Sequence, residues 1–251
     1  MRVCLGLVAM LSWACSEPYE CQGCPDRPEA VPADDGKPSG IYKGVYANSE
    51  ANTSGVLRIE IATDHSSGSA VATGDGTDIE ADDSFSVDDQ GEEIVFQFIG
   101  DKIDIELILD TSLGSVRAIE MAIDGEDQKV TVDKEDSDAL VQCYVGTWEG
   151  KEDNDPESEA FEGYWNYLLK EGDIQGMYGG YSSGGLCGAL SNERVELWDF
   201  GSTGDPARCD EFDSGDEGDP LASGKQNGER ASGSWSMYDL YSGTWTGTRE
   251  Y

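Results

Sequence analysis

The sequence predicts an all-β protein, an antiparallel meander that forms one or two barrels or sandwiches after a disordered N-terminal tether. Apolar and charged side chains alternate with a period of two in short runs, most clearly at residues 57–61 and 102–107. Such alternation is typical of strands with one buried and one solvated face. Clusters of Asp, Gly and Ser separate the runs and supply turn chemistry. The 32 glycines, with 6 Trp and 11 Tyr, favour strands and tight turns over helices.

The first 14 residues are predicted to be a signal peptide. Arg2 supplies a small positive charge, and residues 3–13 form an apolar stretch of signal-peptide length. This stretch is too short to cross a bilayer as a helix, which needs about 20 residues. Small residues at Ser12 and Ala14 satisfy the rule for cleavage before Cys15.

The residues around that cleavage point, Leu-Ser-Trp-Ala-Cys at 11–15, resemble a bacterial lipobox. The resemblance implies that Cys15 is acylated and anchors the mature chain in the bacterial cell envelope, with the outer membrane as the expected location. The lipobox family places Leu three residues before the cysteine, where this chain has Ser12. Ordinary cleavage at the same bond would instead release a protein that begins at an unmodified Cys15.

Cysteine parity bears on the choice between these two products. After ordinary cleavage, six cysteines allow three disulfides, whereas lipidation leaves five and therefore one odd thiol. The six are Cys15, Cys21, Cys24, Cys143, Cys187 and Cys209. The C-x-x-C pair of Cys21 and Cys24 is interpreted as a local disulfide or as inert linker cysteines, because a zinc site would need further ligands and His65 is the only histidine. Cys187 and Cys209 are close enough in sequence to bridge neighbouring strands or a loop.

Composition and a repeated motif divide the mature chain. Residues 15–39 are rich in Pro, Asp and Glu, which predicts a disordered tether. The form Gly-x-aromatic-x-Gly then marks residues 40–44 and returns at 146–150 and at 243–247. The first two occurrences open segments of similar length, so we expect one β segment over 40–142 and a second, barrel-like one over 143–251.

The second segment is similar to small up-and-down β-barrels such as avidins, lipocalin-like proteins and barrel-bearing envelope lipoproteins. Three Gly-containing stretches carry the similarity: one with an aromatic start at residues 163–169, one with the form G-x-I-x-G at 172–178 and one with the form G-x-L-x-G-x-L at 184–190. Gly permits the coiling that closure demands. It implies a fold type and no activity. Pairing of the two Gly-Thr-Trp ends would close the barrel and remove its edges. A ligand-facing role is the alternative for five aromatics: Trp148, Trp165, Tyr178, Trp235 and Trp245.

The charge balance excludes one class of partner. Acidic residues outnumber basic ones by 52 to 16, and the net charge of -36 would repel nucleic acid. The same surface suits solubility in a salt-rich medium, where screening is strong. Loose binding of divalent cations is the other interpretation, and calcium is the candidate cofactor. The best candidate frame holds Asp153, Asp155 and Glu157, although Ser158 replaces the turn glycine of an EF-hand loop.

No catalytic constellation stands out. His65 lies beside Asp64 and Ser66 in a predicted surface turn, whereas a catalytic triad gathers its residues from separate elements. The chain contains no G-x-S-x-G elbow. We therefore expect a non-catalytic, envelope-anchored protein that binds a small ligand or a protein partner, or displays a surface. The alternative is a calcium-ordered structural or adhesive envelope protein. A carboxylate-dependent hydrolase is a weaker alternative, since its acid pair is defined by a spatial separation that sequence does not report.

Overall fold

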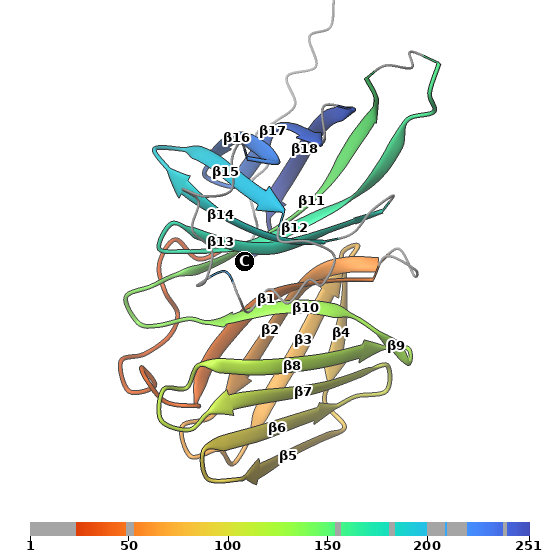
Figure 1. Ribbon diagram of the computed structural model, residues 1–251. Coiled ribbons are helices and arrows are strands. Elements are labelled where there is room, and N and C mark those ends of the chain that lie inside the picture. The colour runs from red at the N-terminus through yellow and green to blue at the C-terminus, as the bar shows by residue number, and fades with distance from the viewer. Residues whose placement is uncertain are drawn as a thin grey trace, which may run out of the picture.

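The computed structural model describes residues 24–48, 53–153, 157–180, 184–199, 209, 220–237 and 240–251. These residues form a β-sandwich followed by a closed β-barrel (Figure 1). The strand pairings of the described residues are all antiparallel, so the predicted all-β antiparallel class is confirmed. No helix in the described part of the chain is long and apolar enough to cross a bilayer.

The sandwich consists of two five-stranded sheets. The first has the order β10-β1-β2-β3-β4, with β1 (Gly40–Asn48), β2 (Thr53–Ile61), β3 (Gly68–Gly74), β4 (Thr77–Ala81) and β10 (Lys129–Lys134). The second has the order β5-β6-β7-β8-β9, with β5 (Ser84–Asp89), β6 (Glu93–Ile99), β7 (Ile103–Asp110), β8 (Val116–Ile123) and β9 (Glu126–Asp127). Side chains of both sheets share one core, which includes Tyr42, Leu57, Phe96 and Leu107.

Period-two alternation explains this core. Along β7 the apolar side chains of Ile103, Ile105 and Leu107 are buried, while Asp104 between them is exposed. Successive strand residues point to opposite faces, so one charged and one apolar face follow directly from the sequence.

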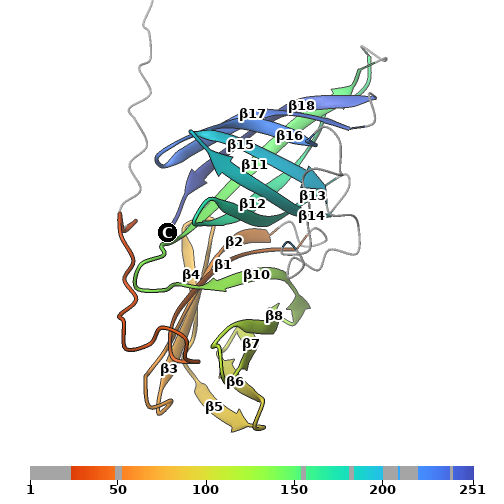
Figure 2. The ribbon, with the colours of Figure 1, turned by 60° about the vertical axis from the view of Figure 1, so that its left-hand side comes forward.

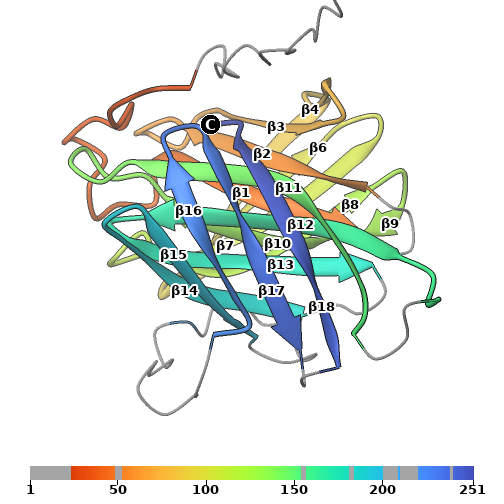
Figure 3. The same ribbon diagram turned by 90° about the horizontal axis from the view of Figure 1, so that it is seen from above.

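The barrel follows the sandwich directly in sequence, because β10 ends at Lys134 and the first barrel strand begins at Val141. Its strands are β11 (Val141–Glu152), β12 (Phe161–Lys170), β13 (Asp173–Gly180), β14 (Gly184–Ser191), β15 (Arg194–Asp199), β16 (Ala222–Asn227), β17 (Arg230–Met237) and β18 (Tyr241–Arg249). Pairing of β11 with β18 closes the ring, and Trp148 lies opposite Trp245. The predicted closure through the two Gly-Thr-Trp motifs is thus confirmed. Figure 3 looks onto β16, β17 and β18, on the side away from the sandwich.

Glycine makes room for the tryptophans inside this barrel. Three indoles each lie opposite a glycine on the neighbouring strand: Trp148 opposite Gly163, Trp235 opposite Gly243 and Trp245 opposite Gly233. A Cβ atom at Gly163 would come within 2.6 Å of the Trp148 ring, far closer than packed atoms approach. Backbone carbonyl oxygens of the strand on the other side lie closer still at all three glycines, so these positions are kept free of side chains both by the indoles and by the neighbouring backbone.

The barrel and the sandwich share a second, smaller core. The outer face of β11, β12 and β13 packs on the outer face of β1 and β2, and this cluster includes Val45, Val56, Leu168 and Met177 (Figure 2). The Asn166 side-chain amide adds a buried hydrogen bond to the Tyr46 carbonyl oxygen, at 3.0 Å. The apolar cluster and this hydrogen bond together hold the two units against each other.

A buried ion pair lies beside this junction. Lys43 Nζ on β1 is 2.7 Å from Glu135 Oε2, and both side chains are fully buried. The other oxygen of Glu135 accepts hydrogen bonds from the backbone N–H groups of Glu29 and Ala30, at 2.7 and 3.3 Å. Burying a charge is costly unless it is paired and hydrogen-bonded, and here both conditions are met.

These contacts order the segment that precedes β1. The expected disordered tether covers residues 15–39, but its described part, residues 24–39, follows the junction between the two units. Arg249 of β18 donates to the carbonyl oxygen of Pro25, and Glu29 pairs with both Lys43 (3.0 Å) and Arg58 (2.7 Å). The difference has a physical cause: polar composition favours disorder, but partners distant in sequence supply the missing contacts.

Candidate functional site

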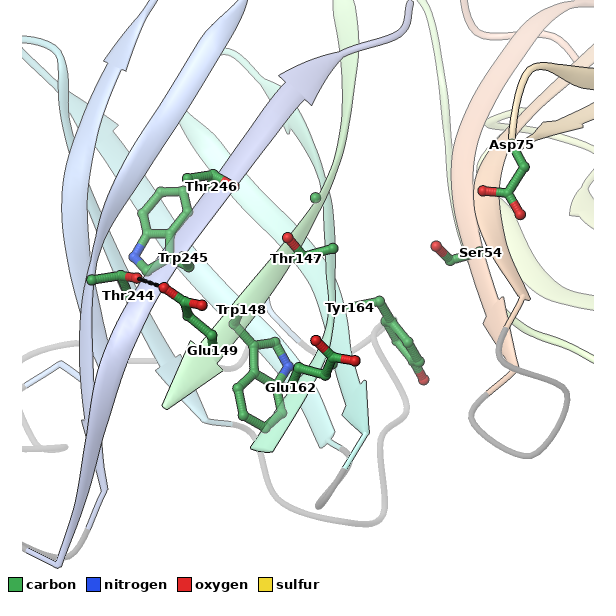
Figure 4. Close-up of a pocket in the computed structure, with 12 residues that line it drawn as sticks. Ser54, Asp75, Thr147, Trp148, Glu149, Glu162, Tyr164, Thr244, Trp245 and Thr246 are labelled. Carbon is green, nitrogen blue, oxygen red and sulfur yellow. Dashed lines mark hydrogen bonds between the residues drawn. The ribbon is translucent and has the colours of Figure 1, made fainter. Parts of the chain in front are cut away.

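A groove of about 540 Å³ lies between the barrel and one end of the sandwich (Figure 4). Its barrel wall is the outer face of β11, β12 and β18, and its other wall is the start of β2 with the β3–β4 turn. The side chains that line it and are labelled in the figure are Ser54, Asp75, Thr147, Trp148, Glu149, Glu162, Tyr164, Thr244, Trp245 and Thr246.

Barrel closure positions one wall. Because Trp148 and Trp245 point inward, their neighbours in sequence must point outward. The register places Thr147 opposite both Tyr164 and Thr246, and Glu149 opposite both Glu162 and Thr244. The Gly-Thr-Trp motif thus serves both surfaces of the barrel: its Trp fills the core and its Thr lines the groove.

A tight turn positions the opposite wall. Asp75 and Gly76 both have positive φ angles, 50° and 71°, as a two-residue type I′ hairpin requires. This Asp-Gly turn joins β3 to β4 and presents the Asp75 carboxylate to the groove (Figure 4). Ser54, near the start of β2, lies on the same wall.

The groove is rich in oxygen atoms. Among the described residues, its lining holds three carboxylates, from Asp75, Glu149 and Glu162, and no lysine, arginine or histidine. Glu149 and Glu162 are direct cross-strand neighbours, and like charges so placed destabilise a sheet. The Thr244 hydroxyl donates a 3.3 Å hydrogen bond to Glu149. A ligand that donated hydrogen bonds or carried positive charge would relieve this repulsion.

The five aromatics singled out from the sequence come together inside the barrel. Trp148, Trp165, Tyr178, Trp235 and Trp245 all belong to its buried core, and none is more than 7% exposed. Trp148 donates its indole N–H to the Gly179 carbonyl oxygen, and Trp235 donates to that of Glu149. Trp165 and Trp245 stack on each other, with ring centroids 5.7 Å apart. These residues form the core behind the groove, and only Trp148 and Trp245 also contribute to its lining.

The predicted Cys187–Cys209 pair is present as a disulfide, with Cα atoms 5.5 Å apart. This separation is ordinary for a bridged pair. Cys24 is also disulfide-bonded, while Cys15 and Cys21 lie outside the described residues. Cys143 is a free thiol, fully buried beside the junction of the two units.

The candidate calcium-binding segment around Asp153, Asp155 and Glu157 lies only partly within the described residues. Asp153 accepts a hydrogen bond from the Ser242 hydroxyl, Glu157 is exposed, and Asp155 lies outside the described residues. Nowhere in the described ranges do three or more His, Cys, Asp or Glu side chains gather in a way that could hold a metal ion. His65, in the turn after β2, packs its ring edge-on against Phe96, with centroids 5.3 Å apart.

Sequence reasoning missed the groove itself. Alternation around Trp148 and Trp245 could have placed Thr147, Glu149 and Thr244 on the outer face. The contribution of Ser54 and Asp75 depends on how the two units dock, and no local sequence pattern reports that docking.

Comparison with known proteins does not assign the chain to a family: no family model, no curated protein and no solved structure matches it.

Proposed function

We propose that this chain is a non-catalytic binding lipoprotein of the bacterial cell envelope, whose groove takes a small polar ligand carrying amine or hydroxyl groups. The observation that carries the proposal is the lining of the groove: carboxylate and hydroxyl oxygens from both units surround it, and none of its described lining residues is basic. Such a lining accepts hydrogen bonds and attracts positive charge, so a ligand rich in donors fits it best.

The position of the groove supports this function. Binding sites occur preferentially where units meet and are usually preformed. Here both walls are strands or tight turns, and the apolar cluster around Val45 and Leu168 holds the two units together. A preformed site loses little freedom when a ligand binds. The barrel interior is a less suitable place for the ligand, because the aromatic side chains fill it.

Cysteine pairing supports the lipid anchor. Cys143 is free and buried, and Cys187 is bonded to Cys209. In a chain cleaved before Cys15, this leaves Cys15, Cys21 and Cys24, an odd number, for the N-terminal region. One of these three then carries no disulfide within the chain, which is what acylation of Cys15 requires. Mass spectrometry of the mature protein tests this: a diacyl or triacyl adduct on Cys15 is expected, and an unmodified Cys15 would contradict the anchor.

Thermal unfolding tests the groove. We expect spermidine, a neutral monosaccharide such as glucose, or both to raise the melting temperature, since a ligand at 100 times its Kd adds about 2.7 kcal/mol. Glu162→Gln should abolish the shift caused by an amine ligand, whereas Asp104→Asn, an exposed carboxylate on the sandwich, should retain it. Absence of any shift, or equal shifts in both variants, would exclude the groove as the site. EDTA in the same assay should leave the melting temperature unchanged, whereas a calcium-ordered protein would lose stability.

A further inference from the structure

The segment over residues 24–39, here called the strap, connects the barrel to the sandwich in addition to the direct chain connection between them. Near its start, Arg249 of β18 donates a hydrogen bond to the Pro25 carbonyl oxygen. Near its end, Lys134 of β10 donates to the Asp34 carbonyl oxygen at 2.5 Å. The strap is therefore held by the barrel at one end and by the sandwich at the other, as its course along both units shows (Figure 2).

Between these ends the strap is attached to the buried pair of Lys43 and Glu135. Glu135 accepts hydrogen bonds from the backbone N–H groups of Glu29 and Ala30, and the Glu29 carboxylate lies 3.0 Å from Lys43 Nζ. Arg58 of β2 also pairs with Glu29, at 2.7 Å. Glu135 follows β10 and precedes β11, so this attachment lies where the chain passes from the sandwich to the barrel.

The apolar contact between the two units is modest. Among the described residues, the cluster that joins them holds eight buried side chains, three from the sandwich and five from the barrel. Units of one chain commonly move relative to each other unless their interface is large and hydrophobic. Contacts outside the cluster therefore matter for docking, and the strap supplies them from both units.

The Cys143 thiol belongs to this cluster and lies close to the residues that hold the strap. Its side chain is fully buried, and its backbone N–H donates to the Tyr251 carbonyl oxygen at 3.1 Å. Burial raises the pKa of the thiol, and the charges of Lys43, Glu135 and Arg249 also act on it. The same three side chains contact the strap. Solvent access to Cys143 thus reports whether the strap and the junction are in place.

We propose that the strap is a clasp for the junction: its release lets the barrel move away from the sandwich, exposes the Cys143 thiol and separates the walls of the groove. The contacts described above are hydrogen bonds and ion pairs, which water can replace, so the clasp opens while both units stay folded. The groove is affected because Asp75 belongs to the sandwich, whereas Glu149 and Glu162 belong to the barrel. The clasp does not depend on what the groove binds.

Alkylation of Cys143 tests the clasp. Iodoacetamide is added to the folded protein at pH 8, and modification of Cys143 is followed by peptide mass spectrometry. Glu29→Gln removes two ion pairs of the strap and Arg249→Gln removes its attachment to the barrel. Each should raise the labelling rate at least about 10-fold, because hydrogen bonds to charged groups are among the stronger ones. Arg194→Met, which removes a surface ion pair of the barrel, should leave the rate unchanged, and parent-like rates in both strap variants would overturn the proposal.

Urea dependence separates opening of the clasp from unfolding of the whole protein. Opening at the junction exposes little surface, so labelling in Glu29→Gln should depend only weakly on urea below the unfolding transition. Gly233→Ala disturbs the barrel core without touching the strap, so its additional labelling should increase steeply with urea. An equally steep dependence in Glu29→Gln would show that Cys143 is reached only through global unfolding, and the clasp would then be wrong.

Discussion

Trp245 on β18 lies opposite Gly233 on β17, and its indole nitrogen occupies the space that a side chain at Gly233 would need. A Cβ atom there would lie 2.7 Å from Trp245 Nε1 and closer still to the backbone carbonyl oxygen of Ser223 on β16. Overpacking a filled core typically costs about 1–3 kcal/mol. We therefore expect Gly233→Ala to lower the free energy of unfolding by that amount in urea titrations, although Ala usually suits a strand better than Gly. Ser234→Ala, on the exposed face of the same strand, should change it by less than about 0.5 kcal/mol. Equal stability of both variants would mean that the indole and the Ser223 backbone can both move aside.

The buried pair of Lys43 and Glu135 makes a second prediction. Replacing Lys43 by Met leaves the Glu135 carboxylate buried without its cation, which typically costs about 3–5 kcal/mol. Arg194 and Glu196 form a 2.8 Å pair at the surface, with the Arg194 side chain 66% exposed. Arg194→Met should cost no more than about 1 kcal/mol. Denaturant titration of the two variants checks the contrast, and a loss below 1 kcal/mol in Lys43→Met would contradict it.

Glu29 predicts a specific loss of stability in acid. Burial alone would raise the pKa of its carboxyl, but hydrogen bonds from Arg58 and Lys43 outweigh burial and hold the pKa below the ordinary 4.5. A carboxyl whose pKa is lower in the folded state stabilises the fold above the unfolded-state pKa, and the contribution disappears as the pH falls through the folded-state value. Glu29→Gln should thus be less stable than the parent at pH 7 and equally stable at pH 2. Asp104→Asn, on an exposed face, should follow the parent at both pH values, and a Glu29→Gln deficit that persists at pH 2 would contradict the linkage.

The Cys143 thiol should not react with alkylating reagents in the native protein. Burial raises the pKa of its thiol to about 12, and the thiolate is the nucleophile. Iodoacetamide at pH 8 should therefore leave the folded chain unmodified at this position and add one group in urea, as mass spectrometry would show. Labelling of the folded chain at the rate of a free cysteine peptide would show that the junction between barrel and sandwich opens readily.

The strands and the barrel closure could be predicted because their signals are local. Alternation at residues 102–107 reports which side chains of β7 are buried, and the repeated Gly-Thr-Trp motif marks the two strands that close the ring. The order of residues 24–39 could not be predicted in this way. It depends on Glu135 and Arg249, which lie far away in sequence and become partners only when the fold brings them near.

The candidate site was harder to predict for a related reason. The same Trp-rich composition suits a packed core and a ligand cavity, and the two differ only in whether neighbouring strands leave space. Glycines opposite Trp148, Trp235 and Trp245 provide space that the indoles themselves fill. The groove, in contrast, joins Asp75 of the sandwich to Glu149 and Glu162 of the barrel, so it exists only after the two units dock.

Closure of the ring by β11 and β18 also sets an order of events during synthesis. β11 emerges first and must wait for the whole of the second unit before its final partner appears, and such long-range pairing folds slowly. Until then one edge of β11 is open to pairing with other chains, which is a route to aggregation. Neighbouring nascent copies carry the same strong negative charge and repel one another. The acidic composition thus opposes aggregation through the open edge of β11 while the barrel is incomplete.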